Sequence, residues 1–556
     1  MNSYIKYAIR REALAKKLGN SNKDEFWKEI QSLNKCNTPL PDTINNVTGA
    51  QNILELWRKH FFDLFNCLQR QNIDSSKLIL ESTPNEVLVT AEEVKNAINK
   101  LDLNKTCGDD KIYAEHLKYS SERILPLLSI CITSMFSHGY LPSSMLSVVI
   151  VPIIKDKSGK ISAKDNYRPI AIASILSKII ELIILDRIEI CLLTNPNQFG
   201  FKCNHGTDQC IFAFKEIIDM YTARNSRVSV CFLDASKAFD RINHSVLFDK
   251  LIKRGICGYL LRIIIYWYGT QSMCVRWGNE TSGSFKVSNG VRQGGILSPL
   301  FFNIYIDDLS SKLNKLNIGC IAKQMIINHL MYADDLVLIS PSTAGLQKLL
   351  DVCHKFGLEH DIIFNPKKSA VMFFKPKNAI QLNSPNFTLN SENISIEKKY
   401  NYLGCTICDD LSDEKDIDRQ KRMLYGQGNT IIRKFSMCSL EVKITLFKTY
   451  CTPMYCAQLW CRFKPSSNRT GSLSKLFVAY HSILKLLIGV SRRERNSPIC
   501  VYLNVPTCAV VIRNLIYKFQ CRVEKSVNNI LQALMSSIWY SSSLRSKWRE
   551  LTHIPS

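Results

Sequence analysis

Apolar positions along the chain follow two different periods, and their order predicts an alternation of strands and helices. Continuous β-branched and apolar runs at 146–154 and 228–233 predict buried strands. The segment 90–93, Thr-Ala-Glu-Glu, has the form of a capping box and is followed by apolar residues at helical spacing, which predicts a helix start. Strand and helix patterns alternate up to about residue 405, so the sequence predicts an α+β fold.

The two ends of the chain carry helical patterns only. Residues 1–75 predict basic amphipathic helices that are interrupted at 36–42, where two prolines break the pattern. Beyond residue 409 long helical patterns dominate, notably at 440–459 and 473–487. We therefore expect a basic helical N-terminal extension over 1–85, a further N-terminal region over 86–140, a mixed region over 141–407 and a helical region over 408–556.

The charge balance indicates the kind of partner the protein binds, whereas the overall composition indicates only a folded protein. The chain has 556 residues, of which 46% are hydrophobic and 22% charged, as in ordinary folded proteins. Its 72 Lys and Arg residues against 48 Asp and Glu residues give a formal net charge of +24. Such an excess favours a polyanionic partner, because binding to a phosphate backbone releases counterions.

Cysteine usage and hydropathy exclude several classes of protein. The 21 cysteines are scattered and no secretory signal opens the chain, so we expect reduced thiols in an intracellular protein. Cys405 and Cys408 form a C-x-x-C pair without a second pair at zinc spacing, so no zinc knuckle is expected. The most apolar stretch, 179–190, carries four charged residues and predicts an amphipathic helix rather than a membrane span.

Two adjacent carboxylates, Asp334 and Asp335, interrupt an apolar run that otherwise predicts a buried strand. Neighbouring carboxylates repel each other, so a cation, usually a divalent metal, is expected between them. The apolar run at 228–233 ends in a third acid, Asp234. Three acids at strand ends are the ligand set of a two-metal site, which favours phosphoryl transfer with Mg²⁺. We expect Asp307 and Asp308, in a helical pattern, to be solvated instead.

A glycine-bearing turn, Asn-Gly-Val-Arg-Gln-Gly-Gly at 289–295, precedes a helical pattern that has Pro299 in its first turn. Backbone N–H groups at such a helix start favour a phosphate or the polar edge of a nucleotide, and glycines let a ligand approach closely. This turn lies between Asp234 and the Asp334–Asp335 pair in the sequence, which adds a nucleotide to the predicted chemistry.

The order of the motifs FLDASKAFD, GVRQGGILSPLFFNIYIDDL, YADDLVLIS, NPKKSAVMF and YLG resembles the successive palm motifs of reverse transcriptases, specifically those of non-LTR (LINE-type, jockey-like) retrotransposons. Upstream, LPSSMLSVVIVPIIKDKSGK, DNYRPIAIASILSKIIE and NQFGFKCNHGTDQCIF resemble the fingers and early palm motifs of that family. The resemblance covers roughly 100–410 and implies a right-hand polymerase. Its fingers, antiparallel-sheet palm with flanking helices and helical thumb would occupy 86–140 (a fingers extension), 141–407 (fingers and palm) and 408–556.

The resemblance also implies a role for individual residues. The metal ligands would be Asp234, Asp334, Asp335 and the backbone carbonyl of Ala235, and the nucleotide would contact Lys155, Arg168, Phe239, Gln293 and Gly294. Phe239 matches the steric gate that excludes a ribose 2′-OH, and Lys368 matches the lysine proposed to protonate pyrophosphate. Tyr402, Leu403 and Gly404 match the primer grip. For Lys155, Arg168 and Lys368 a solvated surface charge is the alternative interpretation.

The implied reaction is DNA synthesis on an RNA template, in which a primer 3′-OH attacks the α-phosphate of a dNTP. Two Mg²⁺ ions, which Mn²⁺ could replace, would serve as cofactors. An RNA template, a DNA primer or target DNA and dNTPs would be the partners, with no membrane involved and with a nuclear location. Two alternatives are a related polymerase with another role, such as an intron maturase or domesticated enzyme, and a catalytically inactive RNA-binding relic.

Two departures from the family pattern accompany this resemblance. The early loop reads Gly-Asp-Asp-Lys-Ile at 108–112, where the family often has a sequence close to Gly-Pro-Asp-Gly-Ile. About 100 residues precede the matched region, fewer than the family's endonuclease needs, and the C-terminal region has no Cys/His cluster. We therefore expect a polymerase piece of a larger or truncated element.

Overall fold

The computed structural model describes residues 17–18, 24–34, 40–68, 87–157, 159–188, 193–376, 385–460, 471–537 and 548. Much of the predicted basic N-terminal extension lies outside these residues. Helix α2 (Asp24–Asn34) and the β1 (Thr43–Ile44) and β2 (Val47–Thr48) hairpin are its first described elements. No helix in the described part of the chain is long and apolar enough to cross a membrane.

A six-stranded, largely antiparallel sheet forms the centre of the fold. Its strand order is β11 (His329–Tyr332), β12 (Asp335–Ser340), β5 (Val228–Ser236), β14 (Ala370–Phe374) and β17 (Ser395–Ile396), with β13 (Ile363–Phe364) also paired to β5. Alternate side chains of β5 enter two different hydrophobic clusters, Val230 and Phe232 on one face and Cys231 and Leu233 on the other. Burial on both faces explains why this strand reads as a continuous apolar run rather than an alternating one.

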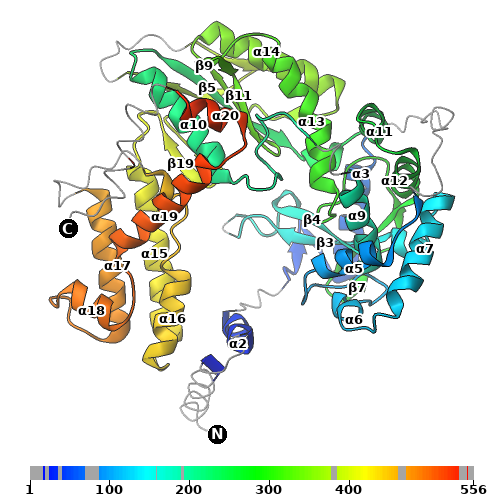
Figure 1. Ribbon diagram of the computed structural model, residues 1–556, viewed down its shortest axis with the longest axis horizontal. Coiled ribbons are helices and arrows are strands. Elements are labelled where there is room, and N and C mark those ends of the chain that lie inside the picture. The colour runs from blue at the N-terminus through cyan, green and yellow to red at the C-terminus, as the bar shows by residue number, and fades with distance from the viewer. Residues whose placement is uncertain are drawn as a thin grey trace.

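Helices cover both faces of this sheet (Figure 1). Helix α10 (Thr207–Thr222) contributes to the first cluster, and α13 (Ser298–Asn314) and α14 (Thr343–Glu359) contribute to the second. The short helix η4 (Ala238–Arg241) and α11 (His244–Lys253) follow β5 directly. The hairpin β9 (Cys320–Ala322) and β10 (Met325–Ile327) precedes β11, and the hairpin β15 (Thr388–Leu389) and β16 (Glu392–Asn393) precedes β17.

A second sheet lies beside the first and has the order β4 (Tyr167–Ala173), β3 (Ser147–Ile154), β6 (Ser272–Trp277) and β7 (Glu280–Thr281), with β8 (Phe285–Lys286) also paired to β6. Helix α3 (Ala50–Phe65) packs on it through Trp57, which is fully buried. The Trp57 ring lies 4.9 Å from Tyr167 and 5.8 Å from Trp277, between ring centroids. Part of the predicted N-terminal extension is thus integral to this sheet's core, although the predicted boundary at 85 stays a prediction.

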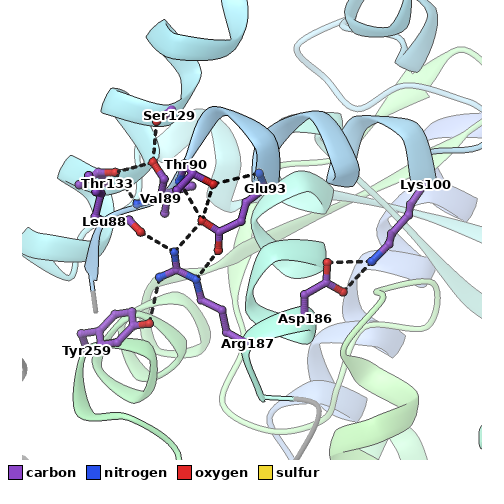
Figure 2. A network of polar contacts seen from close by, with 10 residues as sticks. All are labelled: Leu88, Val89, Thr90, Glu93, Lys100, Ser129, Thr133, Asp186, Arg187 and Tyr259. Atoms are coloured by element: carbon purple, nitrogen blue, oxygen red, sulfur yellow. Dashed lines mark hydrogen bonds and ion pairs between the residues drawn. The ribbon is translucent and has the colours of Figure 1, made fainter. Parts of the chain in front are cut away.

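A polar network joins the helices around the second sheet, α5 (Ala91–Lys100), α7 (Ile124–His138), α9 (Ile175–Ile188) and α12 (Gly258–Thr270) (Figure 2). Thr90 and Glu93 form the predicted capping box at the start of α5. Arg187 of α9 donates to Glu93 at 2.8 Å, to the Leu88 carbonyl at 2.7 Å and to the Tyr259 hydroxyl at 2.9 Å. The capping acid therefore also anchors α9, while the short helices α6 (Ala114–Lys118) and α8 (Ser143–Leu146) connect these elements.

The prediction of an amphipathic helix over 179–190 needs correction: a helix forms there, but most of its residues are buried. Helix α9 is buried on several sides, and Glu181 is only 2% exposed. Its carboxylate forms a buried ion pair with Arg292 and accepts from the Ile296 N–H at 2.8 Å. A buried cation thus replaces the solvent that the helical pattern had suggested for this acid.

The described C-terminal elements are helical, after the hairpin β18 (Lys399–Tyr402) and β19 (Cys405–Cys408). They are α15 (Glu414–Lys434), α16 (Leu440–Tyr450), η5 (Ala457–Leu459), α17 (Ser472–Ile488), α18 (Asn496–Tyr502), α19 (Cys508–Glu524) and α20 (Asn529–Met535). The predicted helix at 473–487 is confirmed as α17. The one predicted at 440–459 is wrong in its second half, because α16 ends at Tyr450 and Pro453 follows, and proline disfavours helix before it.

The predicted α+β class with an antiparallel central sheet is confirmed. In Figure 1 the second sheet and its helices lie on one side of the molecule and α15–α19 on the other, with the first sheet joining them.

Candidate active site

Strand pairing brings the three predicted acids together at one end of the central sheet. In the antiparallel pair of β12 and β5, Asp335 lies directly opposite Asp234. Tyr332 pairs with Asp335, so Ala333 and Asp334 form the two-residue turn between β11 and β12. Directly opposite residues have Cβ atoms roughly 5 Å apart. Two carboxylates from the strands and one from the turn therefore converge on a small volume.

The electrostatics of this cluster favour a bound cation. Burial raises the pKa of Asp334, the nearby Asp234 charge raises it further, and Arg168 acts in the opposite direction. Burial raises the pKa of Asp335 to about 6, with further contributions from Asp334 and Asp234. A hard divalent cation would relieve this repulsion, and carboxylate oxygens are its preferred ligands.

The backbone of β5 adds a fourth oxygen to the donor set. Asp234 uses its N–H toward the Ser369 hydroxyl at 3.3 Å and its carbonyl toward the Asn365 N–H at 2.9 Å. Backbone groups of successive strand residues point to opposite edges, so the Ala235 carbonyl points to the β12 side. Since β12 begins opposite Asp234, this carbonyl lies beyond the last paired residue and fits the ligand role that the resemblance implies.

The turn that carries Asp334 is held by Gln198, a residue to which the sequence motifs assigned no role. Gln198 is 2% exposed, and its Oε1 accepts from the Ala333 N–H at 2.9 Å and from the Gly200 N–H at 2.8 Å. Ala333 has a φ of 58°, which alanine rarely adopts. A Cβ on Gly200 would lie 2.4 Å from the Ala333 nitrogen, so only glycine permits this close approach.

The turn after β13 supports Asp234 from the other side. The Ser369 hydroxyl donates to the Asn365 carbonyl at 2.7 Å while it accepts from the Asp234 N–H. Lys368 is exposed at this turn, one residue before Ser369. Neither Asn365 nor Ser369 was singled out from the sequence, although both lie in the NPKKSAVMF motif.

Cations gather beside the acids. Lys155 follows β3, and its Nζ donates to the Asp165 carbonyl at 3.4 Å. Arg168 is exposed on β4, opposite Ile153 of β3. Burial lowers the pKa of Lys155, and the neighbouring charges of Lys237, Arg168 and Lys368 lower it further. The structure thus places the three predicted cations, Lys155, Arg168 and Lys368, in one neighbourhood and adds a fourth, Lys237. The backbone of Lys237 is left-handed, with a φ of 53°.

The aromatic gate candidate is anchored by two other rings. Phe239 lies on η4 and is half-buried. Its ring stacks on Phe302 of α13 with centroids 4.4 Å apart at 15°, and it meets Phe201 edge-on at 6.1 Å. A ring held from two sides has a fixed orientation, which suits a steric role.

The glycine turn is tied to β4 of the second sheet and to η4, which follows β5. The Gln293 Nε2 donates to Asp240 at 2.6 Å, and the Gln293 carbonyl accepts from the Ala171 N–H at 2.8 Å. Burial raises the pKa of Asp240 to about 6. Gly294 has a φ of 119°, and a Cβ there would lie 2.9 Å from the Ala171 carbonyl oxygen, so this position requires glycine.

The predicted primer grip forms the tip of the β18–β19 hairpin, but its tyrosine points inward. Tyr402 is 2% exposed, and its hydroxyl lies 3.3 Å from the Cys210 Sγ in the core. Leu403 is half-buried and Gly404 is exposed at the tip. Any contact with a ligand at this hairpin must therefore come from Leu403, Gly404 or the backbone.

Two other expectations from the sequence can be compared with the structure. Asp307 is not solvated as expected, because it pairs with Arg254 and accepts from the Asn195 N–H at 2.7 Å. Asp308 is exposed but pairs with Lys250 at 2.8 Å.

Cys405 of the C-x-x-C pair lies near Asp416 and Cys456, with their ligand atoms within 4.8 Å of one another, in a group that does not include Cys408. Asp416 already accepts from the Trp460 Nε1 at 2.9 Å and from the Arg419 Nε at 2.9 Å. Its carboxylate is thus committed to structural hydrogen bonds.

Comparison with known proteins agrees with this geometry. Residues 154–407 match the family described as reverse transcriptase (RNA-dependent DNA polymerase). The RNA-directed DNA polymerase from mobile element jockey of Drosophila funebris is 26% identical over 518 residues, covering 89% of this chain and 55% of that protein. Its counterpart in Drosophila melanogaster is 26% identical over 463 residues, covering 80% and 49%.

A third relative, the probable RNA-directed DNA polymerase from transposon X-element of Drosophila melanogaster, is 23% identical and covers 92% of this chain and 57% of that protein. The chain thus spans about half the length of the curated relatives it matches. Among solved structures, apo telomerase from Candida tropicalis matches with a TM-score of 0.38 and 12% identity over 90% of this chain and 85% of that one, a likeness too low to support an argument.

Proposed function

We propose that this chain, whose residues 154–407 are a reverse transcriptase domain related to those of LINE-type retrotransposons, is an RNA-directed DNA polymerase. The observation that carries the proposal is the convergence of Asp234, Asp334 and Asp335 through the register of β5, β12 and the turn before β12. Burial and the neighbouring acids raise the pKa values of Asp334 and Asp335, which fits a site built for divalent ions.

Divalent ions fit this donor set, and we propose Mg²⁺ as the physiological ion. Asp234, Asp334, Asp335 and the Ala235 carbonyl would hold a pair of ions, which supply activation of the primer 3′-hydroxyl and stabilisation of the departing oxygen. The chain's own part is to keep these oxygens fixed. Gln198 holds the turn that carries Asp334, and Ser369 holds the backbone of Asp234.

The triphosphate would bind to the cations beside the acids. Arg168 suits a phosphate because its guanidinium offers paired donors, and Lys155, Lys237 and Lys368 add point charges. Burial, and then crowding by these cations, lowers the pKa of Lys155, and a polyphosphate would relieve the crowding. Lys368, exposed near this cluster, is the proposed proton donor to pyrophosphate.

The sugar and base would lie between the gate and the glycine turn. The anchored Phe239 ring would exclude a ribose 2′-OH, and Gln293, oriented by Asp240, would line the pocket together with Gly294. An RNA template paired to a primer would pass between the second sheet and α15. Arg422, Asn429 and Arg433 lie on the exposed face of α15 and suit contacts to a nucleic-acid backbone. Synthesis onto chromosomal DNA, which the resemblance implies, would take place in the nucleus.

A primer-extension assay tests the proposal. Protein incubated with an RNA template, a DNA primer, dNTPs and Mg²⁺ should extend the primer, and Asp334→Asn/Asp335→Asn should abolish extension. Asp249→Asn, which changes an exposed acid on α11, is the matched control. If folded wild-type protein binds RNA without extending any primer, the RNA-binding relic replaces the enzyme.

A further inference from the structure

The tip of the β18–β19 hairpin is strained. Tyr402 pairs with Cys405, so Leu403 and Gly404 form a two-residue turn, with φ values of 47° and 78°. A turn of this kind favours Asn-Gly, because both central residues need a positive φ. Leucine there costs about 1–2 kcal/mol. Such a conformation persists only where the surrounding structure holds it, and it is most often found at functional sites.

Tyr455, from the segment between α16 and η5, holds this tip. Its hydroxyl donates to the Leu403 carbonyl at 2.7 Å and lies 2.9 Å from the Thr207 hydroxyl, which is then the donor of the second bond. Its ring lies directly under the turn, because a Cβ on Gly404 would approach the Tyr455 Cε1 to 3.0 Å. Three segments that are far apart in the sequence thus meet at one hydroxyl.

The segment that carries Tyr455 is itself fixed. Gln458 donates to Asp208 at 3.1 Å, and Asp208 also pairs with Arg522 of α19. Trp460 is fully buried and donates to Asp416 at 2.9 Å. The tyrosine hydroxyl is therefore mounted on a rigid part of the C-terminal helical region and tied to the start of α10, rather than on a mobile loop.

We propose that Tyr455 is a positioning residue for the primer terminus, which fixes the strained Leu403–Gly404 tip against the central sheet. This inference rests on the proposed function, because it takes the hairpin tip as the surface that contacts the primer. It assigns a role in the reaction to a residue outside the matched motifs. The role is exerted through Leu403 and not by contact with the reacting atoms.

Tyr455→Phe removes the hydroxyl and keeps the ring. We expect the KM for the primed template to rise about five- to tenfold, the value of one lost hydrogen bond, while the KM for dNTP changes less than about twofold. Tyr517→Phe, on the exposed face of α19, is the matched control and should change neither. A change in the dNTP KM equal to that in the primer KM would indicate a general structural role and overturn the inference.

Leu403→Asn gives the turn a residue that tolerates a positive φ. In this background Tyr455→Phe should raise the primer KM by less than about twofold, because the strain that Tyr455 opposes is gone. Hydrogen exchange of the 399–408 amides should be faster in Tyr455→Phe than in wild type. An unchanged exchange rate, or an undiminished Tyr455→Phe effect in the Leu403→Asn background, would overturn the inference. Absence of extension by wild type would instead overturn the proposed function itself.

Discussion

At the residue scale, Asp335 links the charge of the site to the stability of the fold. Its pKa is raised from 3.8 to about 6, so the folded state binds this proton more tightly than the unfolded state does. The stabilisation is present at low pH and is lost as the pH rises through about 4 to 6. Because the side chain reaches solvent, screening limits the effect to about 1 kcal/mol.

We therefore predict that, in metal-free buffer at neutral pH, Asp335→Asn unfolds at a temperature equal to or above that of the wild type. Adding Mg²⁺ should raise the wild-type unfolding temperature more than that of the variant, because the ion binds the charged carboxylates of the folded state. Thermal unfolding followed by circular dichroism, with and without Mg²⁺, measures both effects. An equal Mg²⁺ response in the two proteins would mean that Asp335 does not contribute to an ion site.

The Phe239 ring provides a second test at this scale. Phe239→Val should raise rNTP incorporation relative to dNTP about ten- to hundredfold, because the edge that faces the ribose is removed. The lost stacking on Phe302 should cost about 1–2 kcal/mol of unfolding free energy, since the ring is half-buried. Phe373→Val removes another half-buried ring, which faces Phe387, and is the control for stability alone. Unchanged sugar discrimination in Phe239→Val would make this ring a packing residue only.

Charged residues that stand in an apolar run could be predicted as site residues from the sequence. Residues that hold the site by bonding to main-chain N–H groups could not. Asp334 and Asp335 stand out because charge in an apolar run is costly. Gln198 and Ser369 have no such signature, since each acts on a main-chain N–H of a residue more than a hundred positions away. Only the fold reveals which N–H groups need a partner.

At the element scale, the close contact of the 197–200 segment with the β11–β12 turn gives a third prediction. Gly200→Ala would place a Cβ 2.4 Å from the Ala333 nitrogen, so the turn that carries Asp334 must shift. We expect extension activity to fall at least about tenfold, and unfolding free energy by about 1–3 kcal/mol. Gly283→Ala, where the nearest atom to the new Cβ is 3.8 Å away, is the matched control. Full activity in Gly200→Ala would show that the turn tolerates displacement.

Elements with local signals could be predicted well, and those defined by distant contacts could not. The capping box at Thr90 predicts the start of α5, because both of its hydrogen bonds lie within four residues. The pairing of Glu181 with Arg292 joins residues 111 positions apart, so a helical pattern alone could not show that α9 is enclosed. The early end of α16 had a local signal in Pro453, which the apolar periodicity on either side concealed.

At the scale of the whole molecule, the net charge of +24 gives the fourth prediction. Binding of primed RNA should weaken steeply with salt, since each phosphate contact releases about one counterion. Arg422→Ala and Arg433→Ala, on the exposed face of α15, should each lower the slope of log affinity against log salt by about one and weaken different sequences equally.

Arg123→Ala provides the control, because Arg123 is exposed and directly precedes α7, a helix that lies on the side of the molecule away from α15 (Figure 1). If the duplex follows α15, the salt slope of Arg123→Ala should match that of the wild type, because Arg123 then contacts no phosphate. If binding instead depended only on the total positive charge, the three arginine variants would have equal slopes. Fluorescence anisotropy with a labelled primer–template over a range of salt concentrations separates the two cases. A nucleic-acid backbone bound along α15 must release fewer counterions when Arg422 or Arg433 is removed. Equal slopes for the α15 variants and Arg123→Ala would therefore mean that the duplex binds elsewhere.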